Sequence, residues 1–215
     1  MSKNPQKGLE AALLKAPIVP VMVIEDVKQA VPLARALVKG GLPVLEITLR
    51  TAAALDCIKA IVAEVEGAIV GSGTVLNAQQ LKQSEKAGCV FAVSPGVTDK
   101  ILKSAKDHKI ALLPASATAS EAMYLLEHGY VLQKFFPAES AGGAPYLASL
   151  ASPLPQIRFC PTGGITPALA PTYLKLPNVI TLGGSWMAPK AMVAEGKWDE
   201  IEKLAREAAG LRTTK

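Results

Sequence analysis

The chain has 215 residues, a length that suits one barrel-sized domain better than two separate domains. Half of the residues are hydrophobic and 5% are aromatic, and the net charge of +5 is dispersed, so a nucleic-acid-binding protein is disfavoured. No stretch approaches the roughly 18 consecutive apolar residues of a membrane span, and the N-terminus lacks a signal-peptide layout, so we expect a cytoplasmic protein without membrane contact.

Strand-like apolar runs alternate with helical patterns along the whole chain. The predicted strands, in chain order, are Ile18–Ile24, Val44–Leu49, Ala68–Gly73, Val90–Ser94, Ile110–Pro114, Tyr130–Phe135, Ile157–Thr162 and Val179–Gly183. The predicted helices include Val27–Lys39, Ala52–Val65, Ala78–Ala87, Asp99–Asp107, Ser120–His128 and a final amphipathic helix, Trp198–Ala209. The candidate N-cap residues are Asp26, Thr51, Asn77, Thr98 and Thr166.

This alternation predicts a closed parallel architecture. Strands separated by single helices pair in parallel, because a parallel connection needs a crossover. Eight such units predict a single (β/α)8 TIM barrel over residues 1–215, with segment 1–16 expected to be helical and to precede the first strand. An open doubly wound sheet is the rival, but no G-x-G-x-x-G turn follows the first strand.

The cysteines and histidines limit the chemistry. Cys57, Cys89 and Cys160 show neither metal-ligand nor C-x-x-C spacing, so we expect them to be reduced and mostly structural. The only histidines are His108 and His128, which is too few for a histidine-rich metal site or a histidine-based triad. Acid–base chemistry is therefore expected from carboxylates, lysine or tyrosine. The modest positive charge fits an anionic substrate, and it fits a basic helical surface equally well.

The second predicted strand carries unusual polar residues. Period-two alternation directs Glu46, Thr48 and Arg50 into the barrel and the intervening apolar residues towards the helices. A buried carboxylate is costly unless it is paired or functional. The functional interpretation is an active-site acid or base, and the structural alternative is a Glu46–Arg50 ion pair.

The sixth predicted strand contains Lys134 amid apolar residues. This lysine is either a surface residue with its head in water or a buried amine, disfavoured as an ammonium ion and able to form a Schiff base with a ketone. The segment alone does not decide between the two.

Paired glycines follow the last two strands. Gly163-Gly164 comes after strand seven, and Gly183-Gly184 comes before Ser185 at the end of strand eight. Without Cβ atoms the backbone N–H groups can approach an anion, and in barrels this is the usual position of a phosphate site. Two tight turns are the alternative, but two glycine pairs at consecutive strand ends favour phosphate binding.

Taken together, these segments resemble the bacterial 2-keto-3-deoxy-6-phosphogluconate (KDPG) aldolases, many of which also act on 4-hydroxy-2-oxoglutarate. The resemblance runs over nearly the whole chain and rests on ordered motifs. The motifs are LEITLRT at 45–51, VGSGTVL at 70–76, SPG at 94–96, KFFPAE at 134–139, RFCPTGG at 158–164 and GGSW at 183–186.

The resemblance implies a class I aldolase that cleaves a phosphorylated 2-keto acid, works without a metal or other cofactor, and forms a homotrimer. Lys134 matches the Schiff-base lysine and Glu46 the carboxylate that moves protons. Arg50 and Thr74 match the groups that hold the pyruvate carboxylate.

The resemblance also implies the remaining contacts of the substrate. Pro95 and Phe136 match residues that line the same pocket, and Thr162 matches the residue near the substrate hydroxyl that influences stereochemistry. The phosphate-binding set matches Gly163, Gly164, Gly184 and Ser185.

One position departs from the family pattern. After strand five the family usually has Pro-Gly, whereas this chain has Pro114-Ala115. If the glycine is needed at a positive φ or against the ligand, Ala115 would add strain there.

Two other functions compete with the aldolase. A barrel isomerase or synthase of a phosphorylated sugar would keep the phosphate site but give Lys134 no covalent role. A binding or regulatory protein that has lost catalysis is disfavoured, because Glu46, Arg50 and Lys134 are all present.

Overall fold

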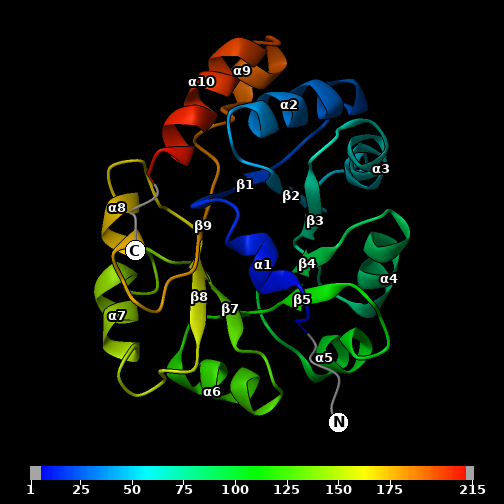
Figure 1. Cartoon of the computed structure of the whole chain (residues 1–215). Helices are drawn as coiled ribbons and strands as arrows, with labels where there is room; N and C mark the ends of the chain where they lie inside the picture. Colours follow the sequence, from blue (N-terminus) through cyan, green and yellow to red (C-terminus); the bar gives the residue numbers. More distant parts are fainter. Residues whose placement is uncertain (1–5, 212–215) are drawn as a thin grey trace.

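The structure, a computed structural model, describes residues 6–211 and consists of parallel strands surrounded by helices (Figure 1). The strands are β1 (Ile18–Met22), β2 (Val44–Thr48), β3 (Ile69–Gly73), β4 (Phe91–Val93), β5 (Ala111–Leu113), β6 (Ala115–Ser116), β7 (Leu132–Phe135), β8 (Arg158–Pro161) and β9 (Leu182–Gly184). The helices are α1 (Leu9–Leu13), α2 (Val27–Lys39), α3 (Ala54–Glu64), α4 (Ala78–Lys86), α5 (Asp99–Ala105), α6 (Ala119–Glu127), α7 (Gly143–Leu150), α8 (Ala170–Leu174), α9 (Lys190–Ala194) and α10 (Trp198–Ala209).

The strands form two parallel sheets in place of the single eight-stranded sheet that the sequence predicts. One sheet has the order β5-β4-β3-β2-β1-β9 and the other has the order β6-β7-β8. The predicted fifth strand is divided at Pro114, which has no N–H group for a ladder, so the chain pairs with β4 before this residue and with β7 after it. At the other junction the structure has two isolated parallel bridges, Phe159–Val179 and Thr162–Gly183.

Two layers of apolar side chains account for the parallel α/β arrangement. The alternate residues Leu45 and Ile47 of β2 belong to a large cluster between the strands and the helices. Val44, on the other face of β2, belongs to a smaller cluster inside the strands, as do Phe91 and Leu132. The predicted alternation of β2 is therefore confirmed, and it places Glu46 on the inner face with Val44.

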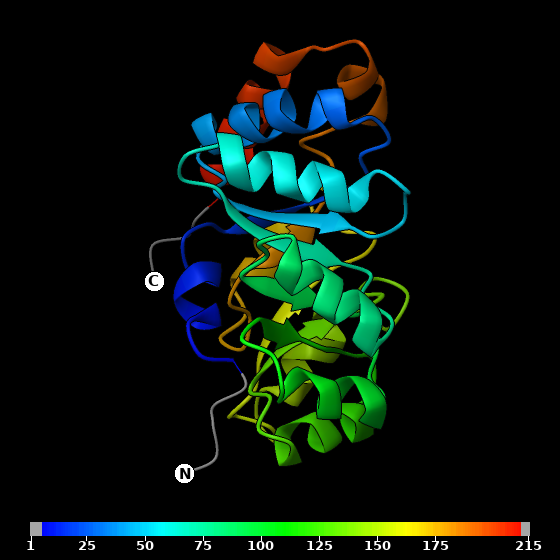
Figure 2. The ribbon, with the colours of Figure 1, turned by 90° about the vertical axis from the view of Figure 1, so that its right-hand side faces the viewer.

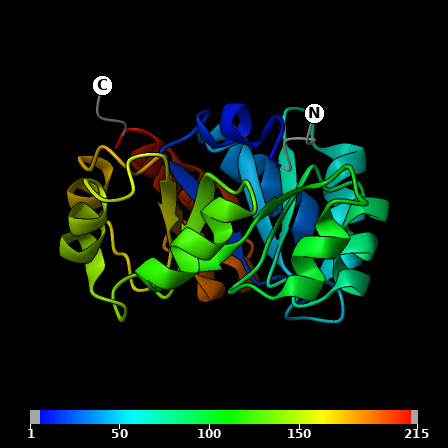
Figure 3. The same cartoon turned by 90° about the horizontal axis from the view of Figure 1, so that it is seen from below.

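Helix α1 closes the amino-terminal end of the strands (Figure 2 and Figure 3). Its Leu9 and Leu13 join the inner cluster, and Gln6 donates side-chain hydrogen bonds to the carbonyls of Leu112 and Leu132. The helix is shorter than the predicted segment 1–16, of which residues 1–5 lie outside the described part of the chain. With this end covered, polar side chains gather at the carboxyl-terminal ends of the strands.

The helix starts follow the predicted caps in three of five cases. Asp26, Asn77 and Thr98 each accept a backbone N–H from the first turn of their helix. The prediction for Thr51 is wrong: its hydroxyl donates to the carbonyl of Ile24, and α3 begins three residues later. The prediction for Thr166 is also wrong, because this residue caps a turn and α8 begins only at Ala170. None of the helices between residues 6 and 211 combines the length and apolar character that crossing a membrane requires.

Candidate active site

The centre of the candidate site is an ion pair between Lys134 of β7 and Glu46 of β2. Lys134 Nζ donates to Glu46 Oε1 at 3.2 Å, although the residues are 88 positions apart in the sequence. They are only 5% and 4% exposed, so both charges are shielded from bulk water. The alternative of a surface lysine at position 134 is therefore wrong. A shielded amine beside a carboxylate has a proton acceptor within reach, which nucleophilic attack on a ketone requires.

Gly73 creates the space that Glu46 occupies. It ends β3 in register with Thr48 of β2. A Cβ atom at position 73 would lie 2.2 Å from Glu46 Oε1, far inside van der Waals contact. The carboxylate can reach Lys134 in this geometry only because residue 73 has no side chain.

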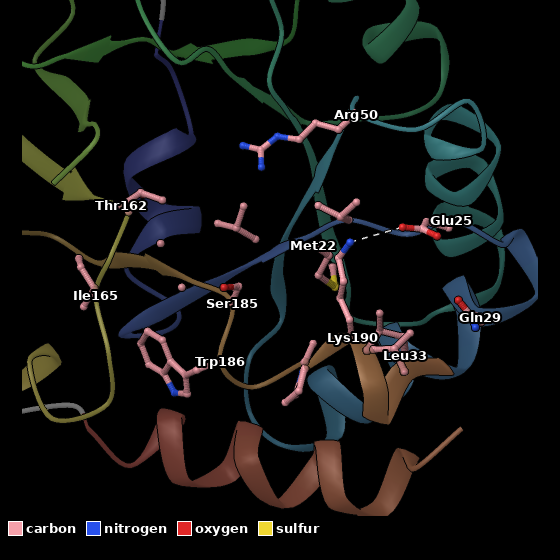
Figure 4. Close-up of a pocket in the computed structure, with 18 of the residues that line it drawn as sticks. Met22, Glu25, Gln29, Leu33, Arg50, Thr162, Ile165, Ser185, Trp186 and Lys190 are labelled. Atoms are coloured by element: carbon pink, nitrogen blue, oxygen red, sulfur yellow. Dashed lines mark hydrogen bonds and ion pairs between the residues drawn. The ribbon is translucent and has the colours of Figure 1, made fainter. Parts of the chain in front are cut away.

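Arg50 pairs with Thr74 rather than with Glu46. The Arg50 Nε donates to Thr74 Oγ1 at 2.9 Å, so the alternative of a Glu46–Arg50 ion pair is wrong. Thr74 has φ 57°, and it is the only non-glycine residue with a positive φ among residues 6–211. Such strain persists only where surrounding structure holds it, and here the strained residue accepts a hydrogen bond from Arg50, whose guanidinium Figure 4 shows at the pocket.

Of the residues expected to line the same pocket, Phe136 lies close to Lys134. The ring of Phe136 has its centroid 5.4 Å from Lys134 Nζ. Pro95 directly follows Ser94 at the end of β4 and is partly buried.

Ala115 lies in β6 in register with Lys134. It does not have a positive φ, so the strain expected if this position required a left-handed glycine does not arise.

A pocket of about 810 Å³ has Arg50, Thr162 and Ser185 in its wall (Figure 4). Several predicted substrate residues line it, namely Arg50, Phe136, Thr162, Gly163, Gly164, Gly184 and Ser185. Lys134, Glu46, Thr74 and Pro95 are not part of its lining. Thr74 is joined to the lining residue Arg50, and Lys134 is in contact with the lining residue Phe136.

Glycines shape the part of the pocket that the ends of β8 and β9 form. Gly163 and Gly164 have φ values of 108° and 78°, which side chains rarely adopt. At Gly184 a Cβ atom would lie 2.2 Å from the ring of Trp186. Thr162 is 7% exposed, and a Cβ atom at Gly183 would lie 2.2 Å from its hydroxyl oxygen. Gly163 and Gly164 line the pocket without side chains, so their backbone N–H groups are candidates for contact with phosphate oxygens.

Cys160 is the other nucleophile near Lys134, because the two residues are in register on β8 and β7. Burial raises the pKa of the Cys160 thiol to about 12. The thiol is therefore protonated at neutral pH, and Lys134 is the better candidate for a nucleophile.

One wall of the pocket was not predicted from the sequence. Glu25 and Gln29, at the junction of β1 and α2, line it together with Lys190 of α9. Glu25 could have been predicted as a site residue, because it directly follows the predicted first strand. No comparable sequence pattern marks Lys190 as a site residue, because its position depends on how the chain turns after β9.

The comparisons with known proteins agree over nearly the whole chain. The family model of KDPG and KHG aldolases matches residues 9–204. The 2-dehydro-3-deoxy-phosphogluconate aldolase of Pseudoalteromonas atlantica is 51% identical over 208 residues, which are 97% of each chain.

Two solved structures are also similar. The KDPG aldolase of Zymomonas mobilis with 3-phosphoglycerate has 50% identity and a TM-score of 0.90, covering 97% of this chain and 98% of the other. The KDPG aldolase of Legionella pneumophila, with pyruvate captured as a covalent carbinolamine, has 40% identity and a TM-score of 0.91, covering 93% and 97%. This chain belongs to the KDPG and KHG aldolase family.

Proposed function

We propose that this chain is a class I aldolase that cleaves KDPG to pyruvate and glyceraldehyde 3-phosphate through a Schiff base at Lys134. The observation that carries the proposal is the shielded ion pair of Lys134 with Glu46. The relative from Legionella pneumophila, which holds pyruvate as a covalent carbinolamine, supports the covalent route. Cleavage of 4-hydroxy-2-oxoglutarate to pyruvate and glyoxylate is a second reaction of the same site.

In the proposed mechanism, Lys134 supplies the nucleophile. Its amine adds to the C2 ketone to give a carbinolamine, and loss of water leaves a protonated imine. Glu46 then takes the proton of the C4 hydroxyl as the C3–C4 bond breaks. The electron pair of that bond moves to the imine, giving an enamine, and the aldehyde product leaves. Protonation of the enamine at C3 and hydrolysis of the imine release pyruvate and restore Lys134.

The other residues bind and orient the substrate. Arg50, held by Thr74, pairs with the carboxylate of the substrate, and Pro95 and Phe136 bound the space around it. Thr162, which lines the pocket, is expected to contact the substrate hydroxyl. The phosphate is bound by Gly163, Gly164, Gly184 and Ser185, and the complex of the Zymomonas mobilis relative with 3-phosphoglycerate supports a phosphorylated ligand.

The proposal includes a closed (β/α)8 barrel formed by one domain. The N–H of Ser94 donates to the carbonyl of Leu113 and the N–H of Lys134 donates to the carbonyl of Pro114, which supports continuity across the break between β5 and β6. The two bridges next to β9 support closure at the other junction. A crystal structure with an open gap at either junction would contradict the closed barrel.

A cytoplasmic homotrimer is the expected assembly. Large hydrophobic side chains are exposed between residues 6 and 211, with Leu76 57%, Val90 55% and Met123 51% exposed. Exposed side chains of this kind support an oligomer, because association would remove them from water. Light scattering after size-exclusion chromatography is expected to give three times the chain mass, and a monomer at micromolar concentration would contradict the trimer.

The covalent step has a direct test. Incubation with pyruvate followed by borohydride is expected to reduce the imine and attach one pyruvyl group to the protein. Peptide mass spectrometry is expected to find the added mass on Lys134, and the exposed Lys59 of the same sample serves as the internal control. Lack of modification, or modification of the surface lysines alone, would show that the mechanism is wrong.

A further inference from the structure

Lys190 and Glu25 form an ion pair on the pocket wall that was not predicted from the sequence. Lys190 Nζ lies 3.4 Å from Glu25 Oε1, and both residues line the pocket that contains Ser185 (Figure 4). The two side chains are 78% and 71% exposed, so water competes with the pair and the pair holds its partners weakly.

A turn after β9 places Lys190 on the wall of the same pocket as Gly184 and Ser185. After β9 the N–H of Ala188 donates to the carbonyl of Ser185 at 3.2 Å, which closes a turn. Helix α9 then begins at Lys190, and both Ser185 and Lys190 line the pocket. An ammonium group on a flexible stem is therefore tethered close to the backbone that the proposed phosphate site uses.

The two carboxylates on this wall have different kinds of partner. Asp26 also lines the pocket, but its carboxylate accepts the N–H of Lys28 at 2.9 Å as a helix cap. Glu25 has the ammonium group of Lys190 as its partner. A phosphate dianion that enters the pocket attracts Lys190 and repels Glu25, so the arriving charge favours an exchange of partners.

We propose that Lys190 leaves Glu25 to contact the phosphoryl oxygens of the substrate and thereby selects phosphorylated over non-phosphorylated 2-keto acids. This inference rests on the proposed function. A substrate without a phosphoryl group leaves the Lys190–Glu25 pair intact and gains no binding free energy from Lys190. Glu25 keeps the ammonium group on the pocket wall until a stronger anion arrives, so the pair sets the difference in affinity between the two substrates.

Lys190→Met is the first test, with kcat and KM measured at low ionic strength for KDPG and for 4-hydroxy-2-oxoglutarate. Loss of one solvent-exposed charge contact is expected to raise KM for KDPG about fivefold and to leave kcat unchanged. KM for 4-hydroxy-2-oxoglutarate is expected to stay within about twofold. Lys190→Arg keeps the charge and is expected to preserve the ratio of the two KM values.

Glu25→Gln is expected to act in the opposite direction. Removal of the competing carboxylate frees Lys190, so KM for KDPG is expected to fall about twofold. Inorganic phosphate supplies a readout that needs no phosphorylated substrate. Its inhibition constant against 4-hydroxy-2-oxoglutarate is expected to rise about fivefold in Lys190→Met and to fall in Glu25→Gln.

Lys197→Met is the matched control, because Lys197 also pairs with an exposed glutamate, Glu195, and does not line the pocket. An unchanged KM ratio and unchanged phosphate inhibition in Lys190→Met overturn the inference, as does an equal change for both substrates. If the unmodified protein cleaves neither substrate, the proposed function itself has failed, so the two failures are distinguishable.

Discussion

Lys134→Arg is expected to reduce pyruvate release from KDPG by at least about 10⁴-fold, on the scale seen when a covalent nucleophile is removed from an enzyme. Arginine keeps a positive charge that can pair with Glu46, but its guanidinium stays protonated and does not form an imine. The variant therefore separates covalent catalysis from a role of the charge alone. A coupled assay of pyruvate release measures the loss, and borohydride trapping with pyruvate is expected to fail in parallel.

The same variant tests the rival function. A barrel isomerase or synthase that uses Lys134 only as a cation would keep much of its activity with arginine. Lys59→Arg is the control, since Lys59 pairs with Asp56 on the exposed face of α3. Circular dichroism and the melting temperature establish that the variant is folded. Retention of more than about a tenth of the activity by folded Lys134→Arg would contradict the Schiff base.

Side chains on the inner face of the site could be predicted where strand alternation alone decides which way they point. Alternation along β2 placed Glu46 inside the strands, and the structure places it there. The partner of Glu46 was not predictable from the residues alone, because Lys134 is 88 positions away and the contact depends on how the sheet curls. The nearer candidate, Arg50, is directed instead to Thr74.

Features that depend on backbone detail could not be predicted from the sequence pattern. A threonine rarely has a positive φ, so the turn at Thr74 had no local signal. The division of the predicted fifth strand did have a local sequence signal. A proline inside a strand pattern removes a hydrogen-bond donor from the ladder, and Pro114 stands at the break. Lys190 reaches the pocket through a turn that no periodic pattern describes.

Glu46→Gln is expected to lower kcat for KDPG cleavage by about 10²- to 10⁴-fold, the range for loss of a general acid–base group. Glutamine has nearly the same shape and can still contact Lys134, but its amide does not accept the proton of the C4 hydroxyl. If Glu46 acts only in proton transfer, Lys134 in this variant still forms an imine with pyruvate, and borohydride still traps it. Glu64→Gln, on the exposed end of α3, is the matched control.

Gly73→Ala tests the same carboxylate without changing its chemistry. The added Cβ would lie 2.2 Å from Glu46 Oε1, so the side chain must move away from Lys134. A displacement of about 1 Å in a reacting group can cost about 10²-fold in rate, and we expect kcat to fall on that scale. If both Glu46→Gln and Gly73→Ala keep kcat within about threefold of the unmodified protein, the proton is moved by another group. The Lys134–Glu46 pair would then only stabilise the lysine in its buried position.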